Sequence, residues 1–327
     1  MRKLIFAIIP AVMLAVSCEK EIRFNGDYEG EKLVLFSLAE PGHPLSARVR
    51  KSSFFLSGQD ENLWEMLPGV TVQARYGDKE ISFERDEEGV YRSSFVPSEG
   101  DHIEISAFKD GFSPVRAETV VPHAPEVSVT MGEVRLNHND VEIHFKLTFH
   151  DRAGERDRYK VAAYTKVYLD DMIYSDTKAS GDGDRKAYYS QQSLMTKDVL
   201  LMDAEVDVLN LDVGDGYACL EYLEDSSFDG EDRTFDVWVE TYVSDKALSL
   251  PDYGLDKYEW VFDILSLSED QYSYLVSLEN YRKYDNGLGA VFGEPVCIHN
   301  NVKGGIGCFG SASGISLSVK KSSSLAL

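Results

Sequence analysis

The residues from Val141 to His150 alternate strictly between apolar and polar side chains. In a β-strand successive side chains point to opposite faces, so this alternation predicts a strand with one buried and one solvated face. Shorter segments of the same kind recur along most of the chain, with turn-forming residues between them. The sequence therefore predicts an all-β, mainly antiparallel fold with a helix in one place only.

Residues 32–122 are expected to form a first domain. Turn residues such as Gly77-Asp78 and Glu88-Gly89 separate its apolar segments, and strands about 8 to 12 residues apart are typical of an immunoglobulin-like or transthyretin-like sandwich. Prolines at both ends of residues 122–125 indicate a linker after it. The expected strands are 33–36, 45–50, 52–56, 70–76, 81–83, 90–96, 102–108 and 115–121.

A second, larger β domain is expected over residues 126–320, with a polar loop at 175–185. It should carry one C-terminal helix over residues 269–283, because Ser268 is a good N-cap and Gln271 would complete a capping box. The helix has an apolar stripe typical of packing on a sheet, formed by Tyr274, Leu275, Leu278 and Tyr281. The expected strands are 141–150, 159–169, 187–193, 217–223, 235–243 and 258–267.

The N-terminus has the pattern of a signal peptide over residues 1–17. Two basic residues precede an apolar run from Leu4 to Val16, which is too short to span a bilayer because spanning needs about 20 residues. The small residues Ala15-Val16-Ser17 suit cleavage, and Cys18 follows them directly. This arrangement predicts a lipoprotein in which fatty acids such as palmitate are attached at Cys18.

The N-terminal pattern departs from the usual lipoprotein signal at one position, and it has an alternative interpretation. Ala15 stands where a lipoprotein signal usually has leucine, and Leu14 lies one place earlier. The alternative is an ordinary secretory signal beside a chance cysteine. In the lipoprotein interpretation, residues 18–31 form a polar tether between the lipid and the first domain.

The chain is strongly acidic, with a formal net charge of −23. Such a surface repels phosphate backbones and thereby excludes nucleic-acid binding. It also repels anionic lipid head groups, so membrane attachment has to come from the lipid on Cys18. The hydrophobic content of 43% is enough for two buried cores, which is the natural expectation at this length.

Three cysteines lie in the body: Cys219, Cys297 and Cys308. An odd count in an exported protein allows at most one internal bridge. Cys297 and Cys308 flank a glycine-rich turn and are the pair that could form a disulfide. The alternative is that all three are small buried hydrophobic residues.

Four stretches stand out by their order along the chain. They are Cys18-Glu19-Lys20-Glu21-Ile22 followed by Leu33-Val34-Leu35; Gly89 to Ser93 with Pro97 to Asp101; Asp225 to Gly230; and Leu267 to Leu278 followed by Glu294-Pro295-Val296 and Asn301 to Gly310. In this order they resemble the domain of unknown function 4249 family, which comprises outer-membrane lipoproteins of the Bacteroidota. The resemblance covers nearly all of the chain after Cys18.

The resemblance implies a location more than a chemistry. Proteins of this family are often encoded beside TonB-dependent receptors, which implies an accessory role in nutrient capture. Glu19 and Glu21 resemble the surface-export signal of these lipoproteins, which implies a lipid-anchored position on the outer membrane facing the exterior. The family has no assigned catalytic residues to transfer to this chain.

Most candidate catalytic or metal-binding patterns lack either the required spacing or a required residue. His144 and His150 share a strand face but are six residues apart, roughly 20 Å, so they cannot hold one ion. No His-x-x-x-His or Cys-x-x-Cys occurs, and zinc therefore has no support. Residues 310–314 resemble a nucleophile elbow, but Ala312 occupies the position of the serine. No pair of carboxylates stands out as a glycosidase dyad.

One pattern fits a calcium loop. Asp225, Ser227, Asp229, Gly230 and Asp236 fall at loop positions 1, 3, 5, 6 and 12, where oxygen ligands and a glycine are required. Against it, the last position is Asp rather than Glu, and the flanking residues read as strands. The alternative is a simple Asp-Gly hairpin turn. The sequence otherwise indicates no cofactor.

The leading functional hypothesis is a surface-exposed binding or accessory lipoprotein of a TonB-dependent nutrient-uptake system, and not an enzyme. A structural or adhesive surface lipoprotein is the second hypothesis, with the sandwich domain as a spacer. A glycan-active enzyme is the third, because fold alone excludes no activity.

Overall fold

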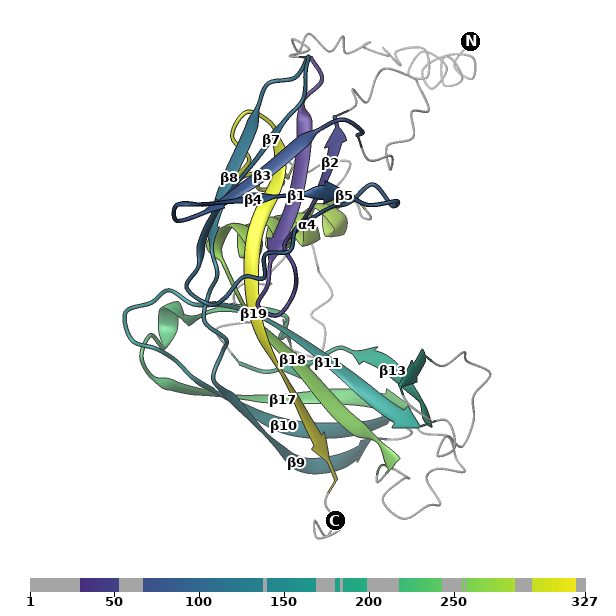
Figure 1. The fold of residues 1–327 in the computed structure, drawn as a ribbon. Helices are drawn as coiled ribbons and strands as arrows, with labels where there is room; N and C mark the ends of the chain where they lie inside the picture. The colour runs from purple at the N-terminus through teal and green to yellow at the C-terminus, as the bar shows by residue number, and fades with distance from the viewer. Residues whose placement is uncertain are drawn as a thin grey trace, which may run out of the picture.

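The structure of the chain is a computed structural model that describes residues 30–52, 67–137, 140–168, 180–182, 185–198, 218–242, 255, 257–285 and 296–321. Within these residues it confirms the all-β class: strands make up the fold, and one α-helix, α4 (Glu269–Asp285), accompanies them (Figure 1). No helix among the described residues is both long enough and apolar enough to cross a bilayer. Cys18 and the expected tether lie outside the described residues.

The described residues contain nineteen strands. In chain order they are β1 (Leu33–Ala39), β2 (Ser46–Lys51), β3 (Thr71–Tyr76), β4 (Lys79–Ser82), β5 (Glu84–Arg85), β6 (Tyr91–Arg92), β7 (His102–Phe108), β8 (Val115–Val120), β9 (Val127–Asn137), β10 (Asp140–His150), β11 (Arg158–Tyr168), β12 (Ser180–Asp182), β13 (Arg185–Gln192), β14 (Met195–Thr196), β15 (Ala218–Cys219), β16 (Tyr222–Glu224), β17 (Asp232–Tyr242), β18 (Glu259–Leu267) and β19 (Ile306–Lys320).

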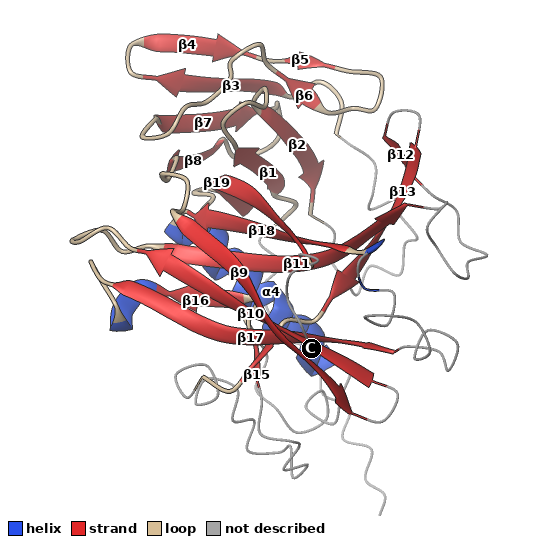
Figure 2. Cartoon of the chain, turned by 90° about the horizontal axis from the view of Figure 1, so that it is seen from below, coloured by secondary structure: helices blue, strands red, loops and turns tan. Residues whose placement is uncertain are grey.

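These strands form three sheets. The largest has the order β12-β13-β11-β18-β19-β1-β2-β6-β5, with β16 also paired to β11; the others are β15-β14-β17-β10-β9 and β4-β3-β7-β8. Figure 2 shows the four-stranded sheet grouped apart from β9, β10 and β17. Because the largest sheet extends past both smaller ones, it forms one layer of two successive sandwiches.

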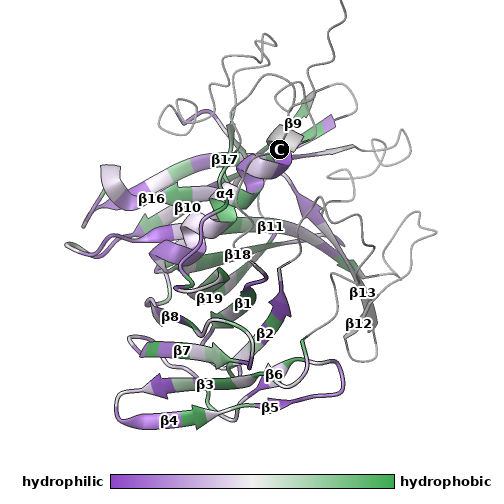
Figure 3. Cartoon of the chain, turned by 90° about the horizontal axis from the view of Figure 1, so that it is seen from above, coloured by the Kyte–Doolittle hydropathy of each residue, from purple (hydrophilic) through white to green (hydrophobic). Residues whose placement is uncertain are grey.

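Each sandwich has its own hydrophobic core, as the alternating patterns require. Figure 3 shows hydrophilic and hydrophobic residues alternating along the strands. The first core lies under the four-stranded sheet and includes Leu35, Val49, Ile103 and Phe309. The second lies under the five-stranded sheet, where β10 buries every second residue from Val141 to Phe149. The expected strand at 141–150 is thereby confirmed with its buried face.

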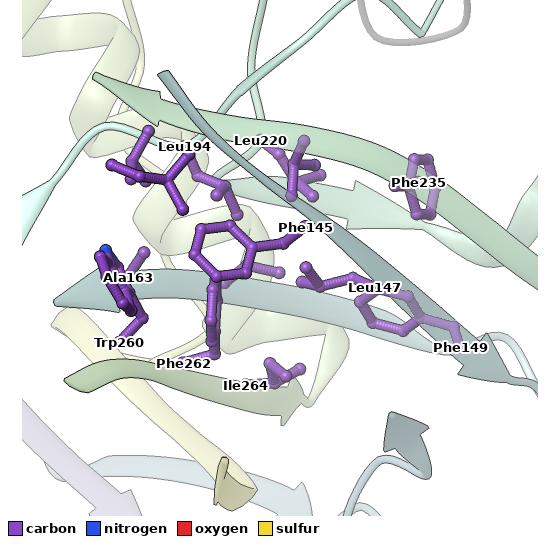
Figure 4. Close-up of a cluster of buried hydrophobic side chains, with 14 of the residues drawn as sticks. Phe145, Leu147, Phe149, Ala163, Leu194, Leu220, Phe235, Trp260, Phe262 and Ile264 are labelled. Atoms are coloured by element: carbon purple, nitrogen blue, oxygen red, sulfur yellow. The ribbon is translucent and has the colours of Figure 1, made fainter. Parts of the chain in front are cut away.

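Aromatic rings fill the centre of the second core. The ring of Phe145 lies 5.0 Å from that of Phe262, edge to face, and 5.9 Å from that of Trp260; Figure 4 shows these side chains between the strands. Edge-to-face pairs stabilise a core beyond the area that they bury. All three residues are at most 1% exposed, so any truncation here would open a cavity.

β19 joins the two sandwiches, and the sequence did not predict it. Its first half pairs in parallel with β1, from Val34 opposite Ile306 to Ala39 opposite Ser311. Its second half pairs antiparallel with β18, from Leu267 opposite Ala312 to Glu259 opposite Lys320. In Figure 1 it runs as one strand through both bodies.

The position of β19 changes the expected domain boundaries. Val302 and Phe309 are buried in the first core, although both fall within the segment 126–320 that was expected to form the second domain. The chain therefore returns to the first sandwich before it ends. The expected linker at 122–125 does separate the strands of the two cores on the N-terminal side.

α4 covers the outer face of the first half of β19. The expected N-cap is confirmed, because the Gln271 backbone N–H donates to Ser268 Oγ at 3.4 Å. The Gln271 side chain lies instead against Gly310, where an added Cβ would be 2.6 Å from the Gln271 Cβ. Tyr274 packs on Phe36 of β1 with ring centroids 5.7 Å apart, whereas Tyr281 of the expected stripe is 42% exposed.

Candidate functional site

A groove crosses the outer face of β13, β11, β18 and the second half of β19. On β11 and β18, alternate residues such as Val161 and Phe262 point into the second core. Their neighbours in the chain therefore face outward. We call this surface the sheet groove and define it by the outward residues Lys160, Ala162, Tyr164, Gln191, Asp263 and Ser316.

The strand register places small residues on both sides of Asp263. Ala162 of β11 lies opposite Asp263, and Ser316 of β19 lies opposite it on the other side. In the next row across the sheet, Tyr164 stands between Gln191 and Val261. The small side chains on either side of Asp263 therefore form the floor of the groove. The larger side chains of Tyr164 and Gln191, in the next row, form one of its sides.

The sheet groove is a continuous hollow of useful size. One cavity of about 880 Å³ runs from the turn after β1, at Glu40 to His43, to Tyr164, Asp263 and Ser316. A second cavity of about 450 Å³ contains the last three residues as well and continues toward Tyr189. Ligand pockets in proteins have volumes of about 300 to 1,000 Å³, so the groove can hold an elongated ligand.

Most charges along the sheet groove are paired. Lys160 Nζ lies 3.9 Å from Glu221, and the ammonium groups of Lys166 and Lys320 lie 4.0 and 3.6 Å from Glu259. Among the described residues, the half-buried carboxylate of Asp263 has no hydrogen-bond or ion-pair partner. The groove therefore carries more carboxylates than ammonium groups, and the carboxylate in its floor, Asp263, is an unpaired hydrogen-bond acceptor.

A separate cavity of about 990 Å³, which is not part of the sheet groove, lies on the outer face of the five-stranded sheet. Trp238 lies in its floor, but the ring is 8% exposed and stacks on His144 with centroids 5.8 Å apart. Lys197 Nζ lies 5.8 Å from the same ring. His144 and Lys197 thus lie against this tryptophan and leave little of its ring for a ligand to contact.

The expected calcium loop forms only in part. Asp225 and Asp229 come together with Asp151, so that one carboxylate oxygen of each lies within 4.8 Å of the others. Ser227 is exposed at the end of a 3-10 helix (Asp225–Ser227), and Asp236 lies on β17 opposite Lys146. The twelve-residue ligand pattern is therefore wrong, because strand β17 has already begun at Asp232 and turns Asp236 onto the outer face of its sheet.

The three aspartates, which we call the aspartate trio, connect two loops. Asp151 Oδ1 accepts from the Tyr159 hydroxyl at 2.8 Å, and its Oδ2 accepts from the Gly230 N–H at 2.9 Å. Asp229 accepts from the Gly154 N–H, and Asp225 from the Asp157 N–H at 2.8 Å. Burial raises the pKa of Asp225, and the charges of Asp151 and Asp229 raise it further.

The structure contradicts the expected disulfide between Cys297 and Cys308, since both thiols are free. Cys308 faces α4 from β19, where its Sγ donates to the Asp270 carbonyl at 3.7 Å. Cys297 is exposed in the segment that leads to β19. Burial, with a smaller effect of the Asp270 charge, raises the pKa of Cys308 to about 12, so this thiol is unreactive.

The glycine-rich stretch that carried the family resemblance has a structural role. Gly307 has a φ of +133°, and a Cβ there would lie 1.9 Å from the Leu35 carbonyl oxygen. Just before it, the Asn301 amide donates to the Phe309 carbonyl at 2.8 Å and accepts from the Phe309 N–H at 3.0 Å. These residues seat β19 against β1, and none of them lines the sheet groove.

None of the residues that define the sheet groove stands out in the sequence. Tyr164 and Asp263 look like ordinary outward residues of two strands, about a hundred positions apart in the chain. Only the pairing of β11 with β18 brings them onto one surface.

Comparison with solved structures gives only distant likenesses. One is a protein proposed to bind carbohydrate from Bacteroides uniformis, with 13% identity over 73% of this chain and 90% of that chain and a TM-score of 0.15. Another is Salmonella alpha-2-macroglobulin reacted with methylamine, with 11% identity, 75% and 14% coverage and a TM-score of 0.23. At these TM-scores neither likeness carries a functional argument.

A proposed membrane-anchored protein from Corynebacterium diphtheriae is similarly distant, with 11% identity, coverage of 74% of this chain and 55% of that one, and a TM-score of 0.17. No curated protein matches the chain. The match to a protein-family model is much stronger evidence, because it extends over residues 19–316. The chain therefore belongs to the family described as domain of unknown function DUF4249.

Proposed function

We propose that this chain is a lipid-anchored lipoprotein on the outer surface of the outer membrane that binds and passes on ligands for a TonB-dependent nutrient-uptake system. The observation that carries the proposal is the N-terminal sequence, in which a short apolar run and small residues lead directly to Cys18. The family resemblance stated above supports the link to a transporter. The sheet groove supplies a surface on which a ligand could be held.

The placement of the sheet groove supports an anchored role. β1 begins at Leu33, directly after the expected tether, and it runs toward the turn at Glu40 that borders the groove (Figure 1). Seven residues of strand span about 23 Å. The chain that leaves the expected tether therefore enters the first sandwich, and the groove begins at the far end of β1.

The chemistry of the groove supports binding rather than turnover. Glycoside hydrolysis usually needs two carboxyl groups about 5 to 9.5 Å apart on either side of the scissile bond. In the sheet groove Asp263 is unpaired, whereas Glu221 and Glu259 are engaged with lysines. The proposal accordingly assigns the chain no catalytic step.

The direct test is extraction of the native membrane in a mild detergent, followed by purification of this protein. We expect a TonB-dependent receptor to co-purify, because a lipid anchor raises the local concentration of a weak partner. The Cys18→Ala protein, which lacks the anchor, should bind the same receptor only weakly. Recovery of the lipoprotein alone, in several detergents and after cross-linking, would contradict the accessory role and favour a structural one.

A further inference from the structure

Tyr164 and Asp263 are the two groups of the sheet groove whose chemistry is not used by the fold. Both are half-buried and face outward, and neither has a hydrogen-bond partner among the described residues. Because the protein engages neither group, both are available to bond to water or to a ligand. A phenol and a carboxylate left open side by side in a groove indicate a ligand that would bind them.

The charges around these two groups restrict the class of ligand. The lysines that face the groove are engaged with Glu221 and Glu259, and Glu40 and Glu99 border one end of the hollow. An anionic ligand would be repelled by these carboxylates. The carboxylate of Asp263 stays unpaired, and a neutral, polar ligand rich in hydroxyl groups can satisfy it by donating hydrogen bonds.

The shape of the groove restricts the ligand further. Ala162, Gly314 and Ser316 leave the floor low along β11 and β19, and the Leu265 side chain packs over Gly314 within the hollow. The hollow continues past Tyr164 into the second cavity, toward Tyr189, which is 43% exposed. A trough of this form suits a chain of several units rather than one small molecule.

We propose that the sheet groove binds a neutral oligosaccharide. The carboxylate of Asp263 would accept hydrogen bonds from vicinal hydroxyl groups, and Gln191 would donate and accept through its amide. The ring of Tyr164 presents an apolar face on which the C–H face of a sugar ring can pack, while its hydroxyl stays in water. Lys166 Nζ lies over the Tyr189 ring, 5.5 Å from its centroid, so Tyr164 is the main stacking residue of the groove. This assignment rests on the proposed function, since it names the nutrient class that such a protein would capture.

The test uses the full-length protein in mild detergent on an array of neutral and acidic glycans, with titration calorimetry on the tightest neutral ligand. We expect binding to at least one neutral oligosaccharide. Asp263→Asn and Tyr164→Ala should each raise its Kd about tenfold or more, the loss expected for a hydrogen bond to a charged group or a packed ring. Tyr281→Ala, which removes an exposed tyrosine of α4, is the matched control and should leave the Kd unchanged.

Several results would overturn the assignment: no neutral glycan bound at millimolar concentration, binding of acidic glycans alone, or an unchanged Kd in Asp263→Asn. If Tyr164→Ala does not fold, Asp263→Asn still decides, because it keeps the shape of an outward side chain. Failure of this ligand assignment can be distinguished from failure of the proposed function. A protein that co-purifies with its receptor but binds no neutral glycan keeps its accessory role and loses this ligand.

Discussion

Asp225 is a carboxylate at 1% exposure with two acidic neighbours, Asp151 and Asp229. Its pKa is raised above the ordinary value, first by burial and then by those charges, although the Asp157 N–H acts in the opposite direction. A carboxylate whose pKa is higher in the folded than in the unfolded state holds its proton more tightly when folded. Its contribution therefore favours the folded state at acid pH and is lost as the pH rises through the folded-state pKa.

Asp225→Asn should consequently stabilise the protein at pH 7 to 8, because the amide can still accept from the Asp157 N–H without carrying the charge. The advantage over the wild type should shrink as the pH falls through the raised folded-state pKa of Asp225, where the carboxylate itself takes up a proton. Chemical denaturation of both proteins across this range measures the difference. Glu231→Gln, in the same turn but outside the trio, is the control, and an advantage that grows toward acid pH would refute the argument.

The same trio allows a test of the calcium prediction. If it holds calcium, millimolar calcium should raise the melting temperature, since a ligand bound only by the native state stabilises it by mass action. Asp229→Ala should then abolish the calcium effect. Melting curves that do not differ between calcium and chelator would leave the aspartate trio as a purely structural connection between the two loops.

The trio shows what the sequence can reveal about single residues. Asp225 and Asp229 were singled out by their spacing around a glycine, and they do lie together. Asp151 was not, because it follows β10 and reaches the trio only through the packing of two loops. Likewise, the free thiols of Cys297 and Cys308 could not be inferred, because turn composition does not determine the direction of a side chain on β19.

At the scale of elements, β19 lies very close to its parallel neighbour β1. Gly307 stands opposite Leu35 with a φ of +133°, a conformation that favours glycine, and there is no space for a Cβ beside the Leu35 carbonyl. Its N–H also donates to Asn300 Oδ1 at 3.0 Å. The first half of β19 therefore depends on this residue for its register with β1.

Gly307→Ala should destabilise the protein by about 3 kcal/mol or more, because backbone strain is added to a clash with main-chain atoms. The matched control is Gly111→Ala, at a φ of +87° with no atom within 4 Å of the added Cβ, which should cost only about 1 kcal/mol. Denaturant unfolding of the two variants measures both values. Equal losses would show that Gly307 does not pack against the Leu35 carbonyl as described.

Elements with clear alternation could be predicted, and those without it could not. The expected strands at 102–108 and 141–150 and the expected helix match β7, β10 and α4 closely. β19 is an exception, because Ile315, Leu317 and Val319 of its second half do alternate with small or polar residues. Its first half is rich in glycine and buried on both faces, and the strand as a whole did not stand out. β9 escaped prediction because a bulge opposite His144 interrupts its register, so its buried residues do not keep one period.

At the scale of the whole molecule, β19 makes the two sandwiches one unit. Separate domains usually unfold separately, but here one strand belongs to both cores. Removing either core should therefore release the strand from the other. This coupling would also fix the sheet groove relative to the first sandwich, which contributes the turn at Glu40 to its border.

Calorimetry should consequently show a single unfolding transition. Phe145→Ala in the second core and Phe309→Ala in the first should each lower the stability of that one transition, by about 3 to 5 kcal/mol. Both side chains are at most 1% exposed. Two transitions, each moved by only one of the variants, would mean that the sandwiches fold independently.

The proposed function depends most directly on the attachment of lipid to Cys18, and fatty-acid labelling in growing cells measures this attachment. The wild-type protein should take up labelled palmitate, and Cys18→Ala should take up none, because the lipid signal requires that cysteine. Cys219→Ala, which removes an exposed thiol of the body, should remain fully labelled. Undiminished labelling of the Cys18→Ala protein would contradict the lipoprotein assignment and the anchored function built on it.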